Sequence, residues 1–224
     1  MWDRLKEKIE SLPAFRSLEG RLAEEGGAAP ATGLVGSSRS LVLSILAGKF
    51  ADPALVLAAD PVSARDIAAD LEEFGMTGVV SYPEDEILPY DYHDPDRNLT
   101  GLQMLALERM AEGECRVLVS TPRAILKKVF PPPLFRALLF DLAVGGREDP
   151  QAAAEKLVRL GYERHGTVES KGQFAIRGAI LDIFEVASED PVRVEFDSDE
   201  IATIRRFDIE TQRSIGNLQR IRIR

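Results

Sequence analysis

The sequence predicts an α/β protein of two domains: a parallel α/β domain over residues 1–125, followed by a smaller α+β domain over residues 126–224 with a mainly antiparallel sheet. In the first domain, apolar strand patterns alternate with helices, which is typical of a parallel sheet covered on both faces. In the second, short strand patterns follow one another with turn signals between them, which is typical of an antiparallel sheet. The proline run at 131–133 lies near the boundary.

The first domain begins with two short amphipathic helices in residues 1–25 and a short strand at Thr32–Val35. Asp60 and Pro61 form an N-cap followed by proline at the first helical position, and Gly75 ends that helix. The other expected elements are helices at 40–50 and 99–111, strands at 54–59, 78–82 and 116–120, and a helix opened by Thr121 and Pro122.

The second domain begins with a helix at 150–160 that ends at Gly161. Strands are expected at 173–177, 179–186, 192–197, 200–207 and 218–224. The last strand pattern runs to Arg224 without a closing turn, so we expect the chain to be a fragment of a longer protein.

The composition is that of a cytoplasmic globular protein. The 224 residues are 45% hydrophobic and 29% charged, which excludes a disordered tail and allows a proper core. The single cysteine, Cys115, excludes an internal disulfide and favours a reducing compartment. No apolar run reaches the roughly 18–20 residues that span a bilayer, and the N-terminus lacks the apolar core of a signal peptide.

Charge is distributed unequally between the two domains. Residues 1–120 hold 11 Lys and Arg against 21 Asp and Glu, whereas residues 121–224 hold 17 against 16, which together give the net charge of −9. The basic residues of the second part are 13 Arg and 4 Lys, and arginine is the cation enriched at protein interfaces. We therefore expect two modules with different partners.

A degenerate phosphate loop is the first candidate site. The segment that begins at Gly33 and includes Gly36 aligns with the pattern G-x-x-x-x-G-K-[ST] and keeps its last position as Ser40. Ser38 replaces the glycine that lets the backbone approach phosphate, and Arg39 replaces the lysine that reaches it. Because no acidic Mg²⁺-binding motif follows, we expect no catalysis and no cofactor here. A weak anion site at the helix N-terminus could remain.

An acidic stretch at 82–96 holds six carboxylates and His93, a composition that also occurs in metal and acid–base sites. Its three prolines favour an extended, solvated loop, so we expect no metal. Nucleophilic catalysis finds no better support, because Cys115 lies in an expected strand.

Alternation along the second domain separates a core face from a charged face. Val192 and Val194 alternate with Arg193 and Glu195, and residues 173–177 repeat the pattern. Any sheet with one buried face needs a polar outside, so alternation alone does not distinguish a binding surface from a solvated one. The use of arginine rather than lysine favours binding.

Several motifs carry a family resemblance. They are Glu86–Asp91, Gly161-Tyr162, Gly172–Phe184, Pro191–Phe196, Asp199–Ile201, Phe207-Asp208 and Thr211–Ser214. With these motifs the chain resembles the N-terminal region of the bacterial transcription-repair coupling factors (Mfd), which is similar to the first two domains of the damage-recognition protein UvrB. The resemblance covers nearly the whole chain beyond about residue 30 and is most specific in the second half.

This resemblance implies a division of labour. The first domain would be a motor-type domain (UvrB domain 1a-like) that has lost its nucleotide site, and the second (UvrB domain 2-like) would bind UvrA. The parent protein would then recruit UvrA to RNA polymerase stalled at DNA damage, in nucleotide excision repair. The polymerase, the DNA and ATP-driven translocation would be handled by parts of the parent beyond Arg224. The chain also lacks UvrB's tyrosine-rich hairpin, so direct damage recognition is not expected.

The resemblance also implies a set of contact residues. They are Arg164, Arg177, Arg193 and Glu195, which we expect on one exposed patch. Phe174 would support the patch from the core side, and Ala175 stands where UvrB carries a further arginine. The alternatives are a nucleotide-dependent DNA translocase, helicase or nuclease fragment that keeps ATP or DNA binding, and nucleic-acid binding through the arginines of the second domain, which would weaken steeply with salt.

Overall fold

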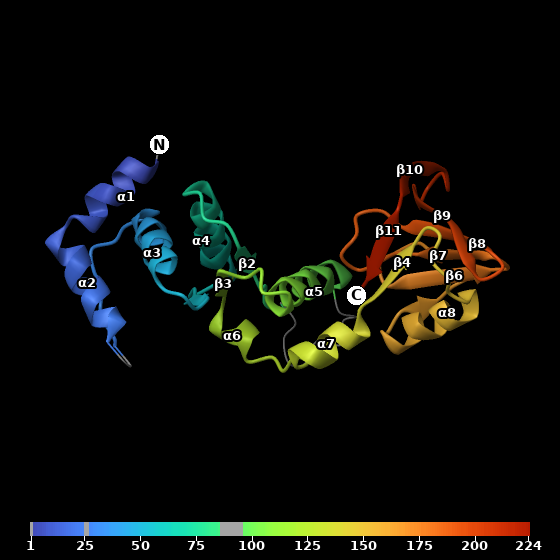
Figure 1. Ribbon diagram of the computed structural model, residues 1–224, viewed down its shortest axis with the longest axis horizontal. Helices are drawn as coiled ribbons and strands as arrows, with labels where there is room; N and C mark the ends of the chain where they lie inside the picture. The colour runs from blue at the N-terminus through green and yellow to red at the C-terminus, as the bar shows by residue number, and fades with distance from the viewer. Residues whose placement is uncertain (1, 25–26, 86–95) are drawn as a thin grey trace. The chain divides into compact units, whose positions relative to one another are not determined.

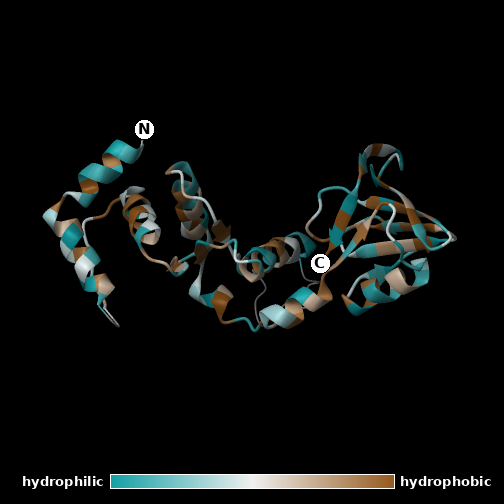
Figure 2. Ribbon diagram, viewed as in Figure 1, coloured by the Kyte–Doolittle hydropathy of each residue, from teal (hydrophilic) through white to brown (hydrophobic). Residues whose placement is uncertain are grey.

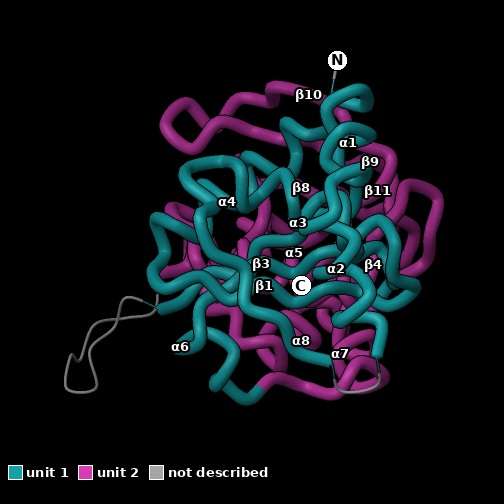
Figure 3. Tube along the Cα trace, turned by 90° about the vertical axis from the view of Figure 1, so that its left-hand side faces the viewer, with its two compact units in different colours: residues 1–85, 112–128 teal, residues 86–111, 129–224 magenta. Residues whose placement is uncertain are grey.

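The computed structural model describes residues 2–24, 27–85 and 96–224, which divide into two compact units. Unit 1 comprises Met1–Asp85 with Glu112–Lys128, and unit 2 comprises Glu86–Ala111 with Val129–Arg224 (Figure 3). The sequence analysis instead places a single domain boundary at residue 125. The domain ranges 1–125 and 126–224 stay a prediction, because compact packing units and domains need not coincide. No described helix is long and apolar enough to cross a membrane.

Unit 1 is a parallel α/β layer. Its helices are α1 (Trp2–Glu10), α2 (Pro13–Ala23), α3 (Ser38–Lys49), α4 (Pro61–Glu73) and α6 (Pro122–Ile125), and its strands are β1 (Ala54–Leu57), β2 (Val79–Ser81) and β3 (Val117–Ser120) (Figure 1). The strands pair in the order β1-β3-β2, and both pairs are parallel. The expected parallel sheet is therefore confirmed.

The start and end of α4 follow the predicted signals. The Asp60 carboxylate accepts a hydrogen bond from the Ser63 amide at 2.8 Å, Pro61 occupies the first turn, and Gly75 adopts φ +78° just beyond the helix. The expected strand at Thr32–Val35 is wrong, because the segment forms no strand and Gly33 has φ +79°. A positive φ does not fit extended pairing.

The sheet of unit 1 is covered less completely than expected. Ile67 and Leu71 of α4 and Ala47 of α3 pack on the strands in a buried cluster. On the other side of β1, Leu55 and Leu57 are 53% and 46% exposed. The expectation that helices cover both faces is therefore wrong along β1.

Unit 2 is built on an antiparallel sheet. Its helices are α5 (Arg97–Ala111), α7 (Pro132–Leu138) and α8 (Pro150–Arg159), and its strands are β4 (Phe140–Ala143), β5 (Glu163–Arg164), β6 (Gln173–Arg177), β7 (Ile180–Ile183), β8 (Val192–Asp197), β9 (Glu200–Phe207), β10 (Ser214–Leu218) and β11 (Arg220–Ile223). Six strands pair in the order β10-β9-β8-β7-β6-β5, antiparallel except for β5 with β6. The expected single strand at 218–224 is split between two strands: Leu218 is the last residue of β10, and Arg220–Ile223 form β11, which pairs with β4 in a separate sheet.

One face of the six-stranded sheet forms the core of unit 2. Phe174, Leu181 and Val194 are fully buried in one cluster with Leu157 of α8. Helix α8 begins where the Asp149 carboxylate accepts a hydrogen bond from the Ala152 amide at 2.9 Å. Hydrophilic and hydrophobic residues alternate along the strands (Figure 2). Because α8 buries the apolar side, the charged side chains of the same strands lie on the opposite face.

Helix α5 packs within unit 2, although the sequence places it in the first domain. A Cβ added to Gly101 would lie 2.1 Å from the Val186 carbonyl oxygen, so helix and chain touch through backbone atoms. Further along α5, the buried Glu108 carboxylate pairs with Arg222 at 2.7 Å and Arg224 at 2.5 Å. These contacts join residues more than 80 positions apart in the sequence, which local patterns do not reveal.

Candidate functional site

Charged side chains form two neighbouring rows on the polar face of the six-stranded sheet. Cross-strand register places Ala175, Asp182, Arg193 and Arg205 in one row, and Arg177, Ile180, Glu195 and Thr203 in the next. Residues two apart along a strand share a face, so both rows lie on the same side. We call Arg177, Asp182, Arg193, Glu195 and Arg205 the arginine face.

Asp182 is the centre of this face. Its side chain is only 1% exposed, and both carboxylate oxygens accept hydrogen bonds. Arg193 Nε and Nη2 donate to Oδ1 and Oδ2 at 2.7 and 2.9 Å, and Arg177 Nη2 donates to Oδ2 at 2.6 Å. One buried carboxylate therefore holds two guanidinium groups from neighbouring strands.

Arg193 is fixed on several sides. Its Nη2 also donates to Gln212 Oε1 at 3.2 Å, and its guanidinium carbon lies 4.7 Å from the centre of the Phe207 ring. The hydrogen bonds to Asp182 raise the pKa of Arg193 above its ordinary value. With a side chain only 19% exposed, Arg193 supports the surface more than it presents donors to a partner.

Arg177 presents its donors outward. Its side chain is 49% exposed, and within the described part of the chain its ion pair is the one with Asp182. A guanidinium carries five N–H donors in a planar fork, so most of them remain available. Arg177 is the member of the face best placed to meet an incoming acceptor.

Glu195 is already engaged within the protein. Its Oε2 accepts a hydrogen bond from Thr203 Oγ1 at 3.0 Å, and its Oε1 pairs with Arg205 Nη2. Both side chains are about one-third exposed. With these pairs formed, the face holds three arginines against two carboxylates and keeps an excess positive charge.

The structure does not bring Arg164 to this face, so the expectation of one patch is wrong for that residue. Arg164 pairs in parallel register with Phe174, whose side chain is fully buried on the α8 side of the sheet. Arg164 lines a groove of about 310 Å³ there with Val158 and Arg159. Phe174 does lie on the core side, as the sequence predicts.

Ala175 differs from the arginine that the resemblance implies for UvrB. It is 1% exposed and packs with Val168 and Phe184, directly across from Asp182. A longer side chain at this buried position would need space that its neighbours now fill, so the packing of this face beside Asp182 depends on the small residue.

Polar groups of the degenerate phosphate loop bond to other groups of the same chain. Gly33 and Gly36 have φ of +79° and +57°, and α3 begins at Ser38. The Ser38 hydroxyl and amide both donate to the Val35 carbonyl, at 2.7 and 3.3 Å. The neighbouring Ser37 hydroxyl donates to the Asp70 carboxylate at 3.0 Å. The hydroxyl groups of Ser37 and Ser38 are therefore both engaged within the protein, and a carboxylate lies beside the loop.

The last two residues of that loop differ in exposure. Arg39 is exposed to solvent, and Ser40 is fully buried. The Ser40 hydroxyl has no hydrogen-bond partner among the described residues.

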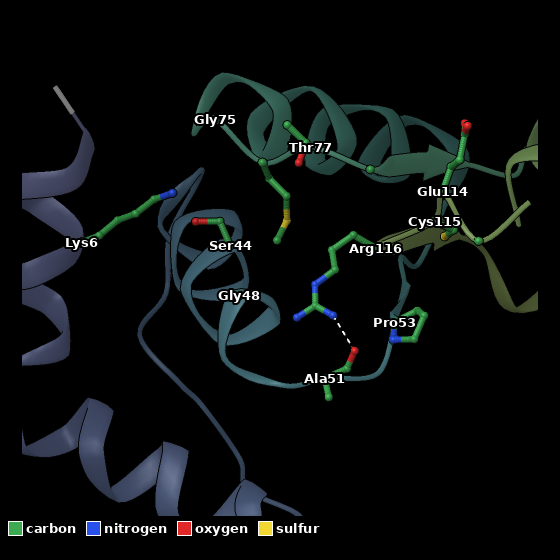
Figure 4. A pocket seen from close by; sticks show the side chains of 13 residues that line it. Lys6, Ser44, Gly48, Ala51, Pro53, Gly75, Thr77, Glu114, Cys115 and Arg116 are labelled. Atoms are coloured by element: carbon green, nitrogen blue, oxygen red, sulfur yellow. Dashed lines mark hydrogen bonds between the residues drawn. The ribbon is translucent and has the colours of Figure 1, made fainter.

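The pocket drawn in Figure 4 has a structural explanation. It measures about 620 Å³ and is lined by Pro53, Gly78 and Arg116, which precede the three strands of unit 1. Ligands of parallel sheets bind at the opposite, carboxyl ends. The Arg116 guanidinium donates to carbonyls at the end of α3, including that of Ala51 at 2.7 Å, and Lys6 donates to the Phe74 carbonyl at the end of α4 at 2.7 Å. Both cations therefore stabilise helix C-termini.

The acidic stretch at 82–96 is only partly described. Residues 86–95, with His93, lie outside the described residues. Asp85 pairs with Lys127 at 2.7 Å. Within the ranges that the structure describes, no group of three or more His, Cys, Asp or Glu side chains could hold a metal.

Sequence reasoning missed Asp182, Arg205 and Gln212. Asp182 interrupts the apolar run 180–184 at an outward-facing position, which is an available signal. Which arginines lie beside Asp182 is decided by the register of the strands, and the local sequence pattern does not reveal that register.

Sequence comparisons connect this surface with known proteins. The family model for the UvrB interaction domain matches residues 140–224, which include the whole arginine face. The chain is 38% identical over 197 residues to the transcription-repair-coupling factor of Myxococcus xanthus, covering 84% of this chain and 16% of that protein. It is 30% identical over 222 residues to that of Bacillus subtilis, covering 99% and 19%, and 26% identical over 190 residues to that of Escherichia coli, covering 85% and 17%. The chain thus spans less than a fifth of the length of these relatives.

Proposed function

Because the chain is homologous to the transcription-repair-coupling factors and its residues 140–224 form a UvrB interaction domain, we propose that it is a non-catalytic docking module that binds UvrA through the arginine face. In the full-length relative, this binding would recruit UvrA to RNA polymerase stalled at DNA damage, as a step of nucleotide excision repair. Contacts with polymerase and DNA would belong to the rest of that longer protein.

The observation that carries this proposal is the charge arrangement within the matched domain. Arg177 is half exposed and ordered by a buried partner, and the surrounding face keeps an excess positive charge. Arginine is enriched among the residues that dominate interface energies, because its planar fork binds carboxylates bidentately. A surface of this kind fits an acidic patch on a protein partner.

The non-catalytic part of the proposal rests on the phosphate loop. Ser38 uses its amide and hydroxyl on Val35, and Asp70 accepts from Ser37 at the same place. Both arrangements oppose phosphate binding, the second because like charges repel. The nucleotide chemistry of the longer relatives would therefore lie outside this chain.

Isothermal titration of the 224-residue chain into purified UvrA tests the proposal. We expect saturable binding that weakens moderately with salt, and no comparable binding to duplex DNA at the same ionic strength. Absence of binding to UvrA at low and moderate salt would reject the proposal. Binding to DNA alone would support the nucleic-acid alternative.

A further inference from the structure

We propose that Asp182 is the positioning residue of the arginine face: it orients Arg177 to receive a carboxylate of the partner while making no contact with the partner itself. The inference rests on the proposed function and adds to it a residue role and the chemistry of the group that is recognised. It follows from burial, from the hydrogen bonds of the two arginines, and from the charge that remains unpaired.

Burial excludes Asp182 as a contact residue. Its side chain is 1% exposed, and Oδ2 is shared between Arg177 and Arg193. A partner therefore meets the arginines and not the carboxylate beneath them. Any effect of Asp182 on binding must pass through the groups that it holds.

The ion pair limits the freedom of Arg177 before a partner arrives. An exposed arginine side chain has several rotatable bonds, and part of its rotamer entropy is lost when a partner fixes it. Arg177 is the last residue of β6, directly before a turn at Gly178, which has φ +60°. The hydrogen bond from its Nη2 to Asp182 holds the side chain over the sheet. Because Arg177 is already ordered, less side-chain entropy is lost when the partner binds.

The unpaired donors define the partner group. Arg193 is occupied by Asp182, Gln212 and the Phe207 ring, so it has little left to offer. Arg177 has used one donor of its fork on Asp182. A planar group with two acceptor oxygens matches the remaining donors, and a carboxylate also neutralises the excess positive charge of the face.

A purely structural role for Asp182 makes a different prediction. If the residue only stabilised the sheet, its loss would lower stability and leave the contribution of Arg177 to binding unchanged. If it orients Arg177, removing either residue removes the same contribution, so the two effects do not multiply. A double-mutant cycle separates the two cases.

The binding experiment uses the 224-residue chain and purified UvrA, with the variants Asp182→Asn, Arg177→Gln and the double variant. The matched control is Asp141→Asn, since Asp141 also pairs with two arginines, Arg220 and Arg222, but in the β4–β11 sheet. We expect binding to weaken at least ~30-fold for R177Q and ~10-fold for D182N. The double variant should match R177Q within ~2-fold, and D141N should match the parent chain.

One further readout and one fallback variant keep the test decisive. In the free chain, ¹⁵N relaxation of the Arg177 Nε–H should show greater mobility in D182N than in the parent or in D141N. If D182N does not fold, the double variant Asp182→Leu/Arg193→Met replaces the buried pair with apolar groups that commonly preserve stability, and it still removes the support of Arg177.

The outcomes separate the two proposals. Folded D182N that binds like the parent, effects of D182N and R177Q that multiply, or unchanged mobility of Arg177 would overturn the positioning role. A parent chain that does not bind UvrA, or R177Q that binds like the parent, would overturn the proposed function. The mobility measurement would then still decide whether Asp182 orders Arg177.

Discussion

Arg193 and Asp182 form a bidentate ion pair across strands β7 and β8, with Nε–Oδ1 and Nη2–Oδ2 distances of 2.7 and 2.9 Å. The Asp182 side chain is buried and the Arg193 side chain is only 19% exposed, so this pair lies on the inner side of the arginine face. The two arginines, which the sequence pattern does not distinguish, therefore have different roles. Arg193 stabilises the face, and Arg177 offers its N–H donors to a partner.

The first prediction concerns Arg193. Arg193→Gln should lower the free energy of unfolding by about 2 kcal/mol or more, because it leaves the buried Asp182 carboxylate with Arg177 alone. Arg206→Gln is the control, since Arg206 is 48% exposed and pairs with Asp190 at 3.8 Å; it should change stability by no more than about 0.5 kcal/mol. Urea unfolding measures both, and equal midpoints for the two variants would contradict the structural role of Arg193.

The second prediction concerns the packing of α5. Gly101→Ala should destabilise unit 2 by about 2 kcal/mol or more, because its Cβ would lie 2.1 Å from the backbone oxygen of Val186. Gly20→Ala, in α2 with open space around it, should instead stabilise the chain by up to about 1 kcal/mol. Thermal unfolding checks the opposite signs. If G101A were as stable as the parent chain, α5 would not pack against Val186.

The third prediction concerns Glu185, which is fully buried with Oε1 3.5 Å from Arg224 Nη1. Burial raises the pKa of Glu185 above its ordinary value of 4.5 in the folded protein. Its contribution to stability is therefore complete below pH 4.5 and is lost as the pH rises through the folded pKa.

Glu185→Gln removes this titration. The parent should therefore lose stability relative to the variant as the pH rises above 4.5, with a slope of at most about 1.4 kcal/mol per pH unit. Unfolding midpoints measured across this pH range test the sign. A parent that gains stability relative to the variant over the same range would contradict it.

The fourth prediction concerns nucleotide binding. The chain should show no micromolar affinity for Mg-ATP, because Ser38 closes the loop on Val35 and the Asp70 carboxylate stands beside it. Titration calorimetry with Mg-ATP measures this directly. Restoring both lost positions with Ser38→Gly and Arg39→Lys should not create affinity while Asp70 remains. Micromolar binding by the parent chain would show that the loop still functions.

Local sequence patterns predicted much of the fold, because caps, strand patterns and turns are local. Asp60, Pro61 and Gly75 set the limits of α4, and alternation placed Arg177 and Arg193 on the outward side of their strands. Contacts between distant segments could not be predicted this way. Gly101 meets Val186 far along the chain, so α5 packs in a different unit from the domain that the sequence assigned to it.

The candidate site shows the same division. Arg164 was misplaced because β5 joins β6 in parallel, which puts Arg164 on the same side as Phe174 and not beside Arg177. Asp182 was missed because its importance comes from Arg193 lying opposite it, which depends on the pairing of two strands. Residue types could be predicted from the sequence, but their grouping required the register of the sheet.

Comparison of Arg177→Gln with Arg206→Gln in binding to UvrA tests the central claim most directly. The two arginines are 49% and 48% exposed and each pairs with one aspartate, but Arg206 lies outside the arginine face. Surface plasmon resonance at fixed ionic strength should show affinity at least ~30-fold weaker for R177Q and within ~2-fold of the parent for R206Q, with both variants folded. Equal affinities for R177Q, R206Q and the parent chain would contradict the assignment of the arginine face as the UvrA-binding surface.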